Sequence, residues 1–293
     1  MTPYSERIAE GVAASGETIQ NTALRQRESR DLIESMLRRR GIHAVKYAAA
    51  DASRLPETEA SHAEHVLYGL MKKYSFRIFL RDLAASLPEI DMALLTRYCS
   101  ENTAKEYLAT LLEQQLLQKV APGQYALTNP QMQTVGDTFE WFVAQVLQRE
   151  FDCPAEYGIR FKHSGVGGDY DVIASVEGHL AYIEVKSSPP KHIEYPEIHA
   201  FFERVSEFRP QIAIFLEDTH LRMRDKLVPM FEEALRQQFG NHADSDYPLR
   251  ELHDEVFVVN NIVFLANTKP DLISNLGVCL KHFLDSCSAW PLA

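Results

Sequence analysis

The sequence predicts an α/β fold in which a mixed sheet flanked by helices is preceded by a mainly α-helical domain. Three observations predict the sheet. A helical pattern covers residues 138–149, two strand-like segments around residues 171–186 form a hairpin, and a helix–strand–helix succession follows at Pro196–Phe208, Gln211–Leu216 and Leu221–Phe239. Helices alternating with strands are typical of an α/β layer architecture. The expected order is therefore helix, strand, two hairpin strands, helix, strand and helix. A second hairpin, with strands over residues 255–259 and 262–266, and a final helix over Leu272–Leu284 are expected to follow.

The helical pattern that precedes the strands carries an acidic residue in its first turn. Asp137 or Thr138 can cap the helix, and Glu140 follows close behind. The apolar side chains recur at helical spacing, at Phe139, Phe142, Val143, Val146 and Leu147. Glu140 lies beside this apolar stripe. It either favours the helix dipole or points towards a site formed by the strands that follow.

The two hairpin strands bring acidic and basic side chains together. Alternation in the segment 180–186 places Glu184 and Lys186 on one face of a strand. A turn containing Gly178 joins this strand to the segment Asp171–Val176, so Asp171 returns towards the same point. Two carboxylates beside an ammonium suit a divalent cation and the chemistry of metal-dependent phosphodiester cleavage. Charges at the end of an exposed strand are the alternative, but the apolar neighbours of all three residues indicate buried strands.

The spacing of these residues resembles the signature of a known superfamily. Asp171, twelve intervening residues and then Glu184-Val185-Lys186 resemble the PD-(D/E)xK motif of restriction-endonuclease-like nucleases. Tyr170 stands where the motif's name has proline, and the resemblance covers roughly the second half of the chain. It implies an αβββαβ core with a mixed sheet flanked by helices. It also implies a Mg²⁺-dependent endonuclease, with Mn²⁺ able to substitute.

The resemblance assigns a role to each residue of the motif. Asp171, Glu184 and the carbonyl of Val185 are expected to hold Mg²⁺, with Glu140 as a further ligand directly or through water. Lys186 is expected to orient the attacking water or to stabilise charge on phosphorus. Asp171, Glu184, Lys186 and Glu140 are therefore the predicted catalytic residues.

Further polar residues near the motif are candidates for contact with substrate. The weak candidates are Lys162, His163, Ser187, Ser188, Tyr195 and His199. A polar cluster that ends a strand, or an ordinary helix surface, explains the last four equally well. The glycine-rich segment 164–168 precedes a strand, so the dinucleotide-binding and P-loop interpretations fail on context.

The first 132 residues are expected to form two parts. Residues 1–60 are predicted to be a helical arm and linker, with a helix over Thr18–Arg40 and a short strand within Ile42–Ala49. Residues 61–132 are predicted to resemble a winged helix, and residues 133–293 to form the nuclease-like domain. The winged-helix pattern consists of three helical segments and a β-ribbon, at Ala63–Lys73, Phe76–Leu87, Thr103–Lys119 and Val120–Thr128. Asn102 or Thr103 is expected to cap the third helical segment.

Composition limits the classes of function. The chain of 293 residues has a net charge of −11, which disfavours broad binding to phosphate. It lacks a long apolar run and the spacing of a zinc site, and its four cysteines suit reduced thiols in a cytoplasmic protein without membrane contact.

The leading hypothesis is a DNA nuclease that serves restriction, repair or defence against foreign DNA. The alternatives are a non-catalytic nucleic-acid-binding or regulatory winged-helix protein with a vestigial nuclease core, and a nuclease subunit that works with a partner ATPase or helicase. A homodimer is expected if both strands of DNA are cut.

Overall fold

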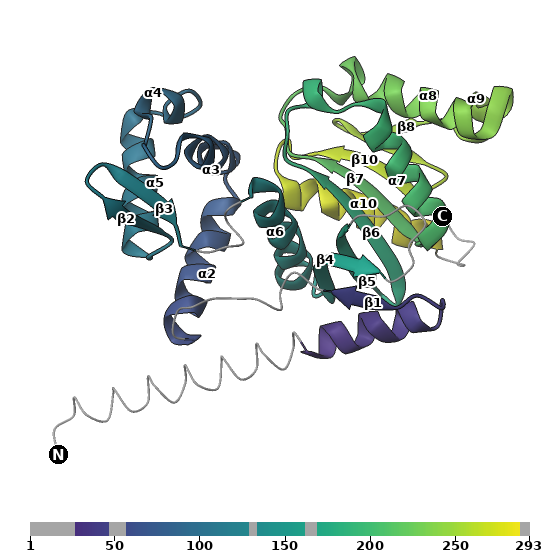
Figure 1. The fold of residues 1–293 in the computed structure, drawn as a ribbon. Coiled ribbons are helices and arrows are strands. Elements are labelled where there is room, and N and C mark those ends of the chain that lie inside the picture. The colour runs from purple at the N-terminus through teal and green to yellow at the C-terminus, as the bar shows by residue number, and fades with distance from the viewer. Residues whose placement is uncertain (1–26, 47–56, 129–133, 162–168, 288–293) are drawn as a thin grey trace. The chain divides into compact units, whose positions relative to one another are not determined.

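The chain divides into two compact units. This computed structural model describes residues 27–46, 57–128, 134–161 and 169–287 (Figure 1). One unit comprises Met1–Ser35 and Ala50–Thr138, and the other comprises Met36–Ala49 and Phe139–Ala293. The two units differ from the expected three parts, because one unit joins most of residues 1–60 to residues 61–132 and extends to Thr138. Residues 36–49, expected in the N-terminal arm, belong to the second unit because their strand pairs with its sheet.

The first unit contains helices followed by a two-stranded ribbon. Its elements are α2 (Glu57–Met71), α3 (Tyr74–Ser86), α4 (Met92–Leu95), α5 (Glu101–Glu113), β2 (Leu117–Ala121) and β3 (Gln124–Leu127). Phe76, Phe79 and Tyr107 pack their rings together and join α3 to α5. The helix expected over Thr103–Lys119 ends earlier. Gln115 has a φ of +55°, and the amide of Leu116 bonds back to the carbonyl of Leu111, so the chain leaves the helix there.

The cap of α5 also differs from the expectation. Ser100 is the N-cap, and its hydroxyl accepts a hydrogen bond from the amide of Thr103, whereas Asn102 or Thr103 was expected to cap this helix. Helices followed by a ribbon are present as predicted. That this arrangement functions as a winged helix stays a prediction.

The second unit is built on one mixed sheet. Its strands lie in the order β1-β4-β5-β6-β7-β10-β9-β8. Their bounds are β1 Ala44–Lys46, β4 Ala155–Phe161, β5 Tyr170–Val176, β6 His179–Lys186, β7 Ile212–Glu217, β8 Arg250–His253, β9 Val256–Val259 and β10 Val263–Asn267. β4, β5 and β6 are antiparallel neighbours, whereas β6, β7 and β10 run parallel. The short strand expected within Ile42–Ala49 is confirmed as β1.

The predicted αβββαβ order is confirmed in this unit. It runs from α6 (Val135–Glu150) through β4, β5 and β6 to α7 (Tyr195–Phe208) and β7. The next helix was expected from Leu221, but α8 spans Leu227–Phe239 and follows a short 3₁₀ turn at Met223–Asp225. The short helix α9 (Ala243–Asp246), strand β8 and the predicted final hairpin and helix α10 (Leu272–Cys287) complete the unit.

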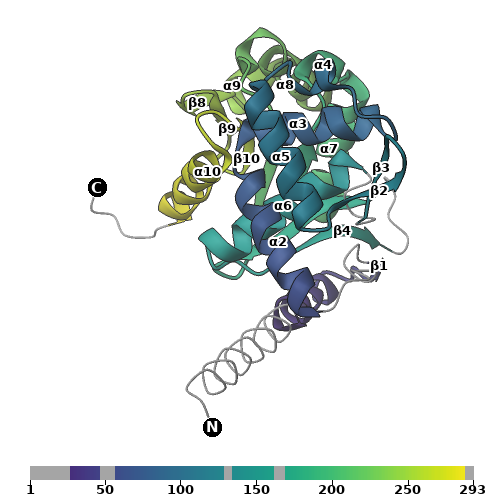
Figure 2. The same ribbon diagram turned by 90° about the vertical axis from the view of Figure 1, so that its left-hand side faces the viewer.

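Helices cover both faces of this sheet. Phe215 of β7 packs against Phe201 of α7 and Phe231 of α8. Phe264 of β10 contacts His282 of α10, which runs along β9 and β10 (Figure 2). Because Phe264 pairs with the residue before Phe215, its side chain points to the opposite face. The sheet is therefore buried on both sides, which explains its continuous apolar strands.

The turn between β5 and β6 fixes the register of the hairpin. Val176 pairs with His179, so only Glu177 and Gly178 lie in the turn. Their φ angles are +47° and +79°, the signs of a type I′ turn, which matches the twist of the two strands. This register determines which side chains face one another at the far end of the hairpin.

Candidate functional site

The predicted acidic and basic residues meet at one end of the β5–β6 hairpin. Val172 pairs with Ile183, so Asp171 faces Glu184 across the two strands. Lys186 follows on the same face of β6 as Glu184. The hairpin register thus brings together the three residues that the motif predicted.

Asp171 is held against the backbone of the neighbouring strand. Its Oδ2 accepts a hydrogen bond of 2.7 Å from the amide of Val185. Burial, reinforced by the negative charge of Glu184, raises the pKa of Asp171 to about 8. Two carboxylates that repel each other in a buried place favour either a proton or a cation between them.

Glu184 is almost fully buried, with 2% of its surface exposed, and several donors share its oxygens. Oε1 accepts a hydrogen bond of 2.8 Å from Nζ of Lys186, and Oε2 accepts one of 2.7 Å from Nη1 of Arg204. The hydroxyl of Tyr182 also donates to Oε2. Burial by itself raises the pKa of Glu184, but the charges of Lys186 and Arg204 outweigh it and hold the pKa below its usual value. Glu184 is therefore an ionised carboxylate.

Lys186 lies between two acidic side chains. Its ammonium is 2.8 Å from Glu184 and 3.5 Å from Oε1 of Glu197 on α7. Burial opposes the charged form, yet Glu184 and its neighbours raise the pKa of Lys186 above its usual value. The lysine is thus a fixed cation beside the paired carboxylates.

Arg204 is a site residue that was not among the candidates predicted from the sequence. It lies on α7, contacts Glu184 and Tyr182, and places its guanidinium 5.7 Å from the ring centre of Tyr170. Its Nε is buried and has no hydrogen-bond partner within the described residues. The helical spacing of the sequence could have identified it. Intervals of four, three and four residues separate Glu197, Phe201, Arg204 and Phe208, so all four lie on one face of α7. The charged side chains of Glu197 and Arg204 therefore share the face that α7 turns to the sheet.

Glu217 is a second site residue that the sequence interpretation missed. It ends β7, pairs in parallel register with Lys186 and has 0% of its surface exposed. Neither oxygen of its carboxyl group has a hydrogen-bond partner within the described part of the chain. Burial, with a contribution from Asp218, raises the pKa of Glu217 well above its usual range. The expected strand stopped at Leu216, one residue short of this acid.

The donor chemistry at Asp171 and Glu184 fits a divalent cation. Carboxylate and carbonyl oxygens are the ligands that Mg²⁺ prefers, and Val185, the residue directly after Glu184, contributes a carbonyl. A cation there relieves the repulsion that raises the pKa of Asp171. Among residues 27–46, 57–128, 134–161 and 169–287, no group of three or more His, Cys, Asp or Glu side chains is arranged to hold a metal.

Glu140 does not complete such a group. It lies half-buried near the start of α6, and its role as a ligand stays a prediction. Lys162 and His163 lie outside the described residues. Ser187 and Ser188 are half-buried just after β6, next to the motif lysine in sequence.

The two candidates on α7 lie at its beginning. The ring of Tyr195 is 6.5 Å from that of His199, and Tyr195 is 43% exposed. A box of hydrogen bonds between Glu194 and Glu197 caps the helix at this point. Both rings therefore lie near the helix turn that carries Glu197, the residue that pairs with Lys186.

The described basic residues next to the motif differ in their surroundings, since Arg160 is paired with an acid whereas Lys191 and His192 are exposed. Arg160 donates two hydrogen bonds to Asp169, at 2.5 and 3.0 Å, so its charge is compensated. Lys191 and His192 are exposed in the 3₁₀ turn after β6.

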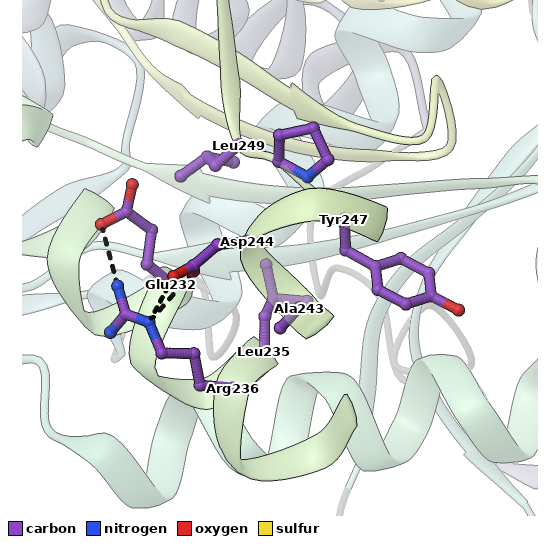
Figure 3. Close-up of a pocket in the computed structure, with 8 residues that line it drawn as sticks. Glu232, Leu235, Arg236, Ala243, Asp244, Tyr247 and Leu249 are labelled. Carbon is purple, nitrogen blue, oxygen red and sulfur yellow. Dashed lines mark hydrogen bonds and ion pairs between the residues drawn. The ribbon is translucent and has the colours of Figure 1, made fainter. Parts of the chain in front are cut away.

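A separate hollow of about 280 Å³ lies at the α8–α9 end of the second unit (Figure 3). Arg236 borders it and pairs with Glu232, Glu233 and Asp244. The full lining consists of Glu232, Leu235, Arg236, Ala243, Asp244, Tyr247, Pro248 and Leu249. None of these residues belongs to the β5–β6 site.

Within the described residues, no helix combines the length and the apolar character that crossing a membrane requires.

Comparisons with known proteins give remote structural likeness only. No protein-family model and no curated protein matches the sequence. Protein VC1899 from Vibrio cholerae is similar with a TM-score of 0.48 and 13% identity, over 87% of this chain and 60% of that one. Can2 from Sulfobacillus thermosulfidooxidans, solved in complex with cyclic tetra-adenylate, is similar with a TM-score of 0.46 and 16% identity, over 88% of this chain and 61% of that one. This chain therefore aligns with about three fifths of the length of each protein.

Proposed function

We propose that this protein is a metal-dependent nuclease that hydrolyses phosphodiester bonds, with DNA as the expected substrate and Mg²⁺ as the expected cation. One observation carries the proposal. Asp171, Glu184 and Lys186 converge at one end of the β5–β6 hairpin, with the lysine ammonium 2.8 Å from the glutamate. Paired carboxylates beside a fixed ammonium provide a place for a cation and a phosphate group side by side.

Each residue has a task that follows from its contacts. Asp171, Glu184 and the carbonyl of Val185 would hold the cation. A bound divalent cation polarises the scissile phosphate and lowers the pKa of a bound water. Lys186 presents a positive charge to the attacking water or to a phosphate oxygen. Arg204 and Tyr182 orient Glu184 through its Oε2, which keeps that carboxylate ionised.

The test is a cleavage panel with variants of the three residues. Purified protein is incubated with supercoiled, linear, single-stranded and branched DNA and with RNA, in Mg²⁺, Mn²⁺ or EDTA. We expect metal-dependent cleavage that falls at least about a hundredfold in Asp171→Ala, Glu184→Ala and Lys186→Ala, as is common when a group that stabilises the transition state is removed. Circular dichroism checks that each variant is folded.

Asp169→Ala is the matched control. Asp169 is two residues from Asp171 and pairs with Arg160 at the surface, so its loss should leave cleavage close to wild type. Cleavage that persists in Asp171→Ala and Glu184→Ala would exclude this site. Tight binding of nucleic acid without cleavage in any metal would favour the non-catalytic alternative. Cleavage that appears only with an added ATPase or helicase would support the partner hypothesis.

A further inference from the structure

Glu217 is an anomaly that the proposed chemistry does not use. A buried carboxyl group normally has a hydrogen-bond partner, because burying it without one is costly. Glu217 is fully buried, and both of its oxygens lack a partner within the described residues. Its place in the sheet is also specific, since the parallel register sets it directly beside Lys186.

The side chains of Lys186 and Glu217 point to the same face of the sheet. Paired residues on neighbouring strands share a face, and the alternation along β6 places Glu184 there as well. The charge of Lys186 acts on Glu217, and so does the charge of Glu197, which lies 3.5 Å from the lysine ammonium. The charge of Lys186 therefore acts on three acidic side chains, Glu184, Glu197 and Glu217, of which Glu217 alone lacks a hydrogen-bond partner within the described residues.

A cation bound to Glu184 would weaken the hydrogen bond between Glu184 and Lys186. Oε1 of Glu184 accepts a hydrogen bond of 2.8 Å from the ammonium of Lys186. A divalent cation bound by the same carboxylate repels a positive charge on that oxygen. The contact with Glu197 is longer and involves a side chain that is 35% exposed, so water screens it more. The displaced ammonium needs a buried acceptor nearby.

We propose that Glu217 is a positioning residue that takes over the ammonium of Lys186 when a divalent cation occupies Asp171 and Glu184. The inference rests on the proposed cation site. With a cation bound, Lys186 would move from Glu184 to Glu217 and keep its charge beside the paired carboxylates. Glu217 touches neither cation nor substrate and acts through the lysine.

Calcium affinity provides the first test, because it does not depend on catalysis. Isothermal titration calorimetry with Ca²⁺ compares wild type, Glu217→Gln and the control Glu197→Gln. We expect Glu217→Gln to weaken Ca²⁺ binding at least about tenfold, since the displaced ammonium then loses a charged acceptor. Glu197→Gln removes the more exposed acid and should weaken binding less than about threefold.

A double-mutant cycle separates positioning from direct ligation. If Glu217 acts through the lysine, adding Glu217→Gln to Lys186→Met changes Ca²⁺ affinity by less than about twofold. An equal loss of affinity in both backgrounds would make Glu217 a ligand of the cation and overturn the inference. Failure of Glu217→Gln to weaken binding in the wild-type background would overturn it as well.

A crystal structure of the wild-type protein with Ca²⁺ tests the same inference without any variant. The ammonium of Lys186 should lie within hydrogen-bond distance of Glu217, and an ammonium that stays on Glu184 with Ca²⁺ bound would overturn the proposal.

Different results would overturn the proposed nuclease function and the proposed role of Glu217. Coupling between Lys186 and Glu217 without cleavage of any nucleic acid overturns only the nuclease function. Cleavage without coupling overturns only the role of Glu217, and absence of Ca²⁺ binding overturns that role too.

Discussion

Glu184 and Glu217 lie on neighbouring regions of the same sheet face and have opposite electrostatic surroundings. Two cations and a tyrosine hydroxyl contact Glu184, and these contacts hold its pKa low despite burial. Glu217 has no comparable donor within the described residues, and burial raises its pKa. The difference shows that the charge of a buried acid here depends on the number of donors that reach its oxygens as well as on burial.

Arg204 should therefore contribute strongly to stability. Arg204→Met leaves Glu184 with Lys186 as its one remaining cationic contact, and breaking a buried ion pair costs about 3 kcal/mol. Urea unfolding followed by the fluorescence of the buried Trp141 measures this loss. Arg236→Met is the control, because its ion pairs lie at the surface and its loss should leave stability near wild type. Equal stability of Arg204→Met and wild type would contradict the expected role of the guanidinium.

The buried acid Glu217 predicts a pH dependence in the metal-free protein. Its pKa is raised in the folded state, so the folded protein binds more protons than the unfolded chain above about pH 4.3. Stability then falls as pH rises from that value towards the folded-state pKa. Glu217→Gln cannot ionise, so it should be more stable than wild type at pH 8 and equal to it near pH 4. Urea unfolding in EDTA between pH 4 and 8 measures the difference, and a gap that widens towards low pH would refute the assignment.

At the scale of single elements, the turn of the β5–β6 hairpin holds the site in register. Glu177 and Gly178 both have positive φ, and only glycine adopts this conformation without strain. No atom lies within 4 Å of a Cβ placed on Gly178, so a substitution there acts through the backbone alone.

Substitutions at the two turn positions should therefore have opposite effects. Gly178→Ala should destabilise the second unit by about 1 kcal/mol, the cost of an L-residue in the left-handed region. Glu177→Asn should stabilise it by up to about 0.5 kcal/mol, because asparagine suits the first position of this turn. Both variants are compared by urea unfolding with the Trp141 signal. The same sign of change at both positions would argue against the type I′ geometry.

The elements that sequence periodicity predicts best are those with a strong local pattern. The α6 helix, the β5–β6 hairpin and the final hairpin all have apolar spacing that a short window detects. The sequence also placed Asp171, Glu184 and Lys186 together, because one hairpin register decides their contact. The predicted end of α5 was wrong because Gln115 adopts a left-handed backbone conformation and stops the helix. The residues after it still have the spacing of a helix, so the sequence alone does not mark this end.

Arg204 and Glu217 were missed for a different reason. Both reach the site through pairing that is distant in sequence, namely the packing of α7 on the sheet and the parallel register of β6 with β7. The pairing of β1 with β4 is distant as well, so the sequence predicted a strand at residues 42–49 without its partner. Local patterns specify elements, whereas contacts between elements depend on the tertiary fold.

At the scale of the whole molecule, charge opposes the proposed substrate. The net charge is −11, and many of the described basic side chains are paired with acids. Examples are Lys105 with Glu101, Arg160 with Asp169, Arg224 with Glu251 and Lys281 with Asp285. With this excess of negative charge, the proposed nuclease should make few phosphate contacts and should depend on a bound metal to attract the backbone.

Salt dependence of DNA binding tests this view. We expect the logarithm of the association constant to fall with the logarithm of salt concentration at a slope no steeper than about −3, which corresponds to about three phosphate contacts. Binding measured by fluorescence anisotropy should strengthen when Ca²⁺ replaces EDTA, because the cation neutralises Asp171 and Glu184. The Asp171→Asn/Glu184→Gln double variant serves as the control, since it should lose the response to Ca²⁺ while its salt slope stays the same. A slope steeper than about −6, unchanged by Ca²⁺, would place DNA recognition on a basic surface away from the hairpin.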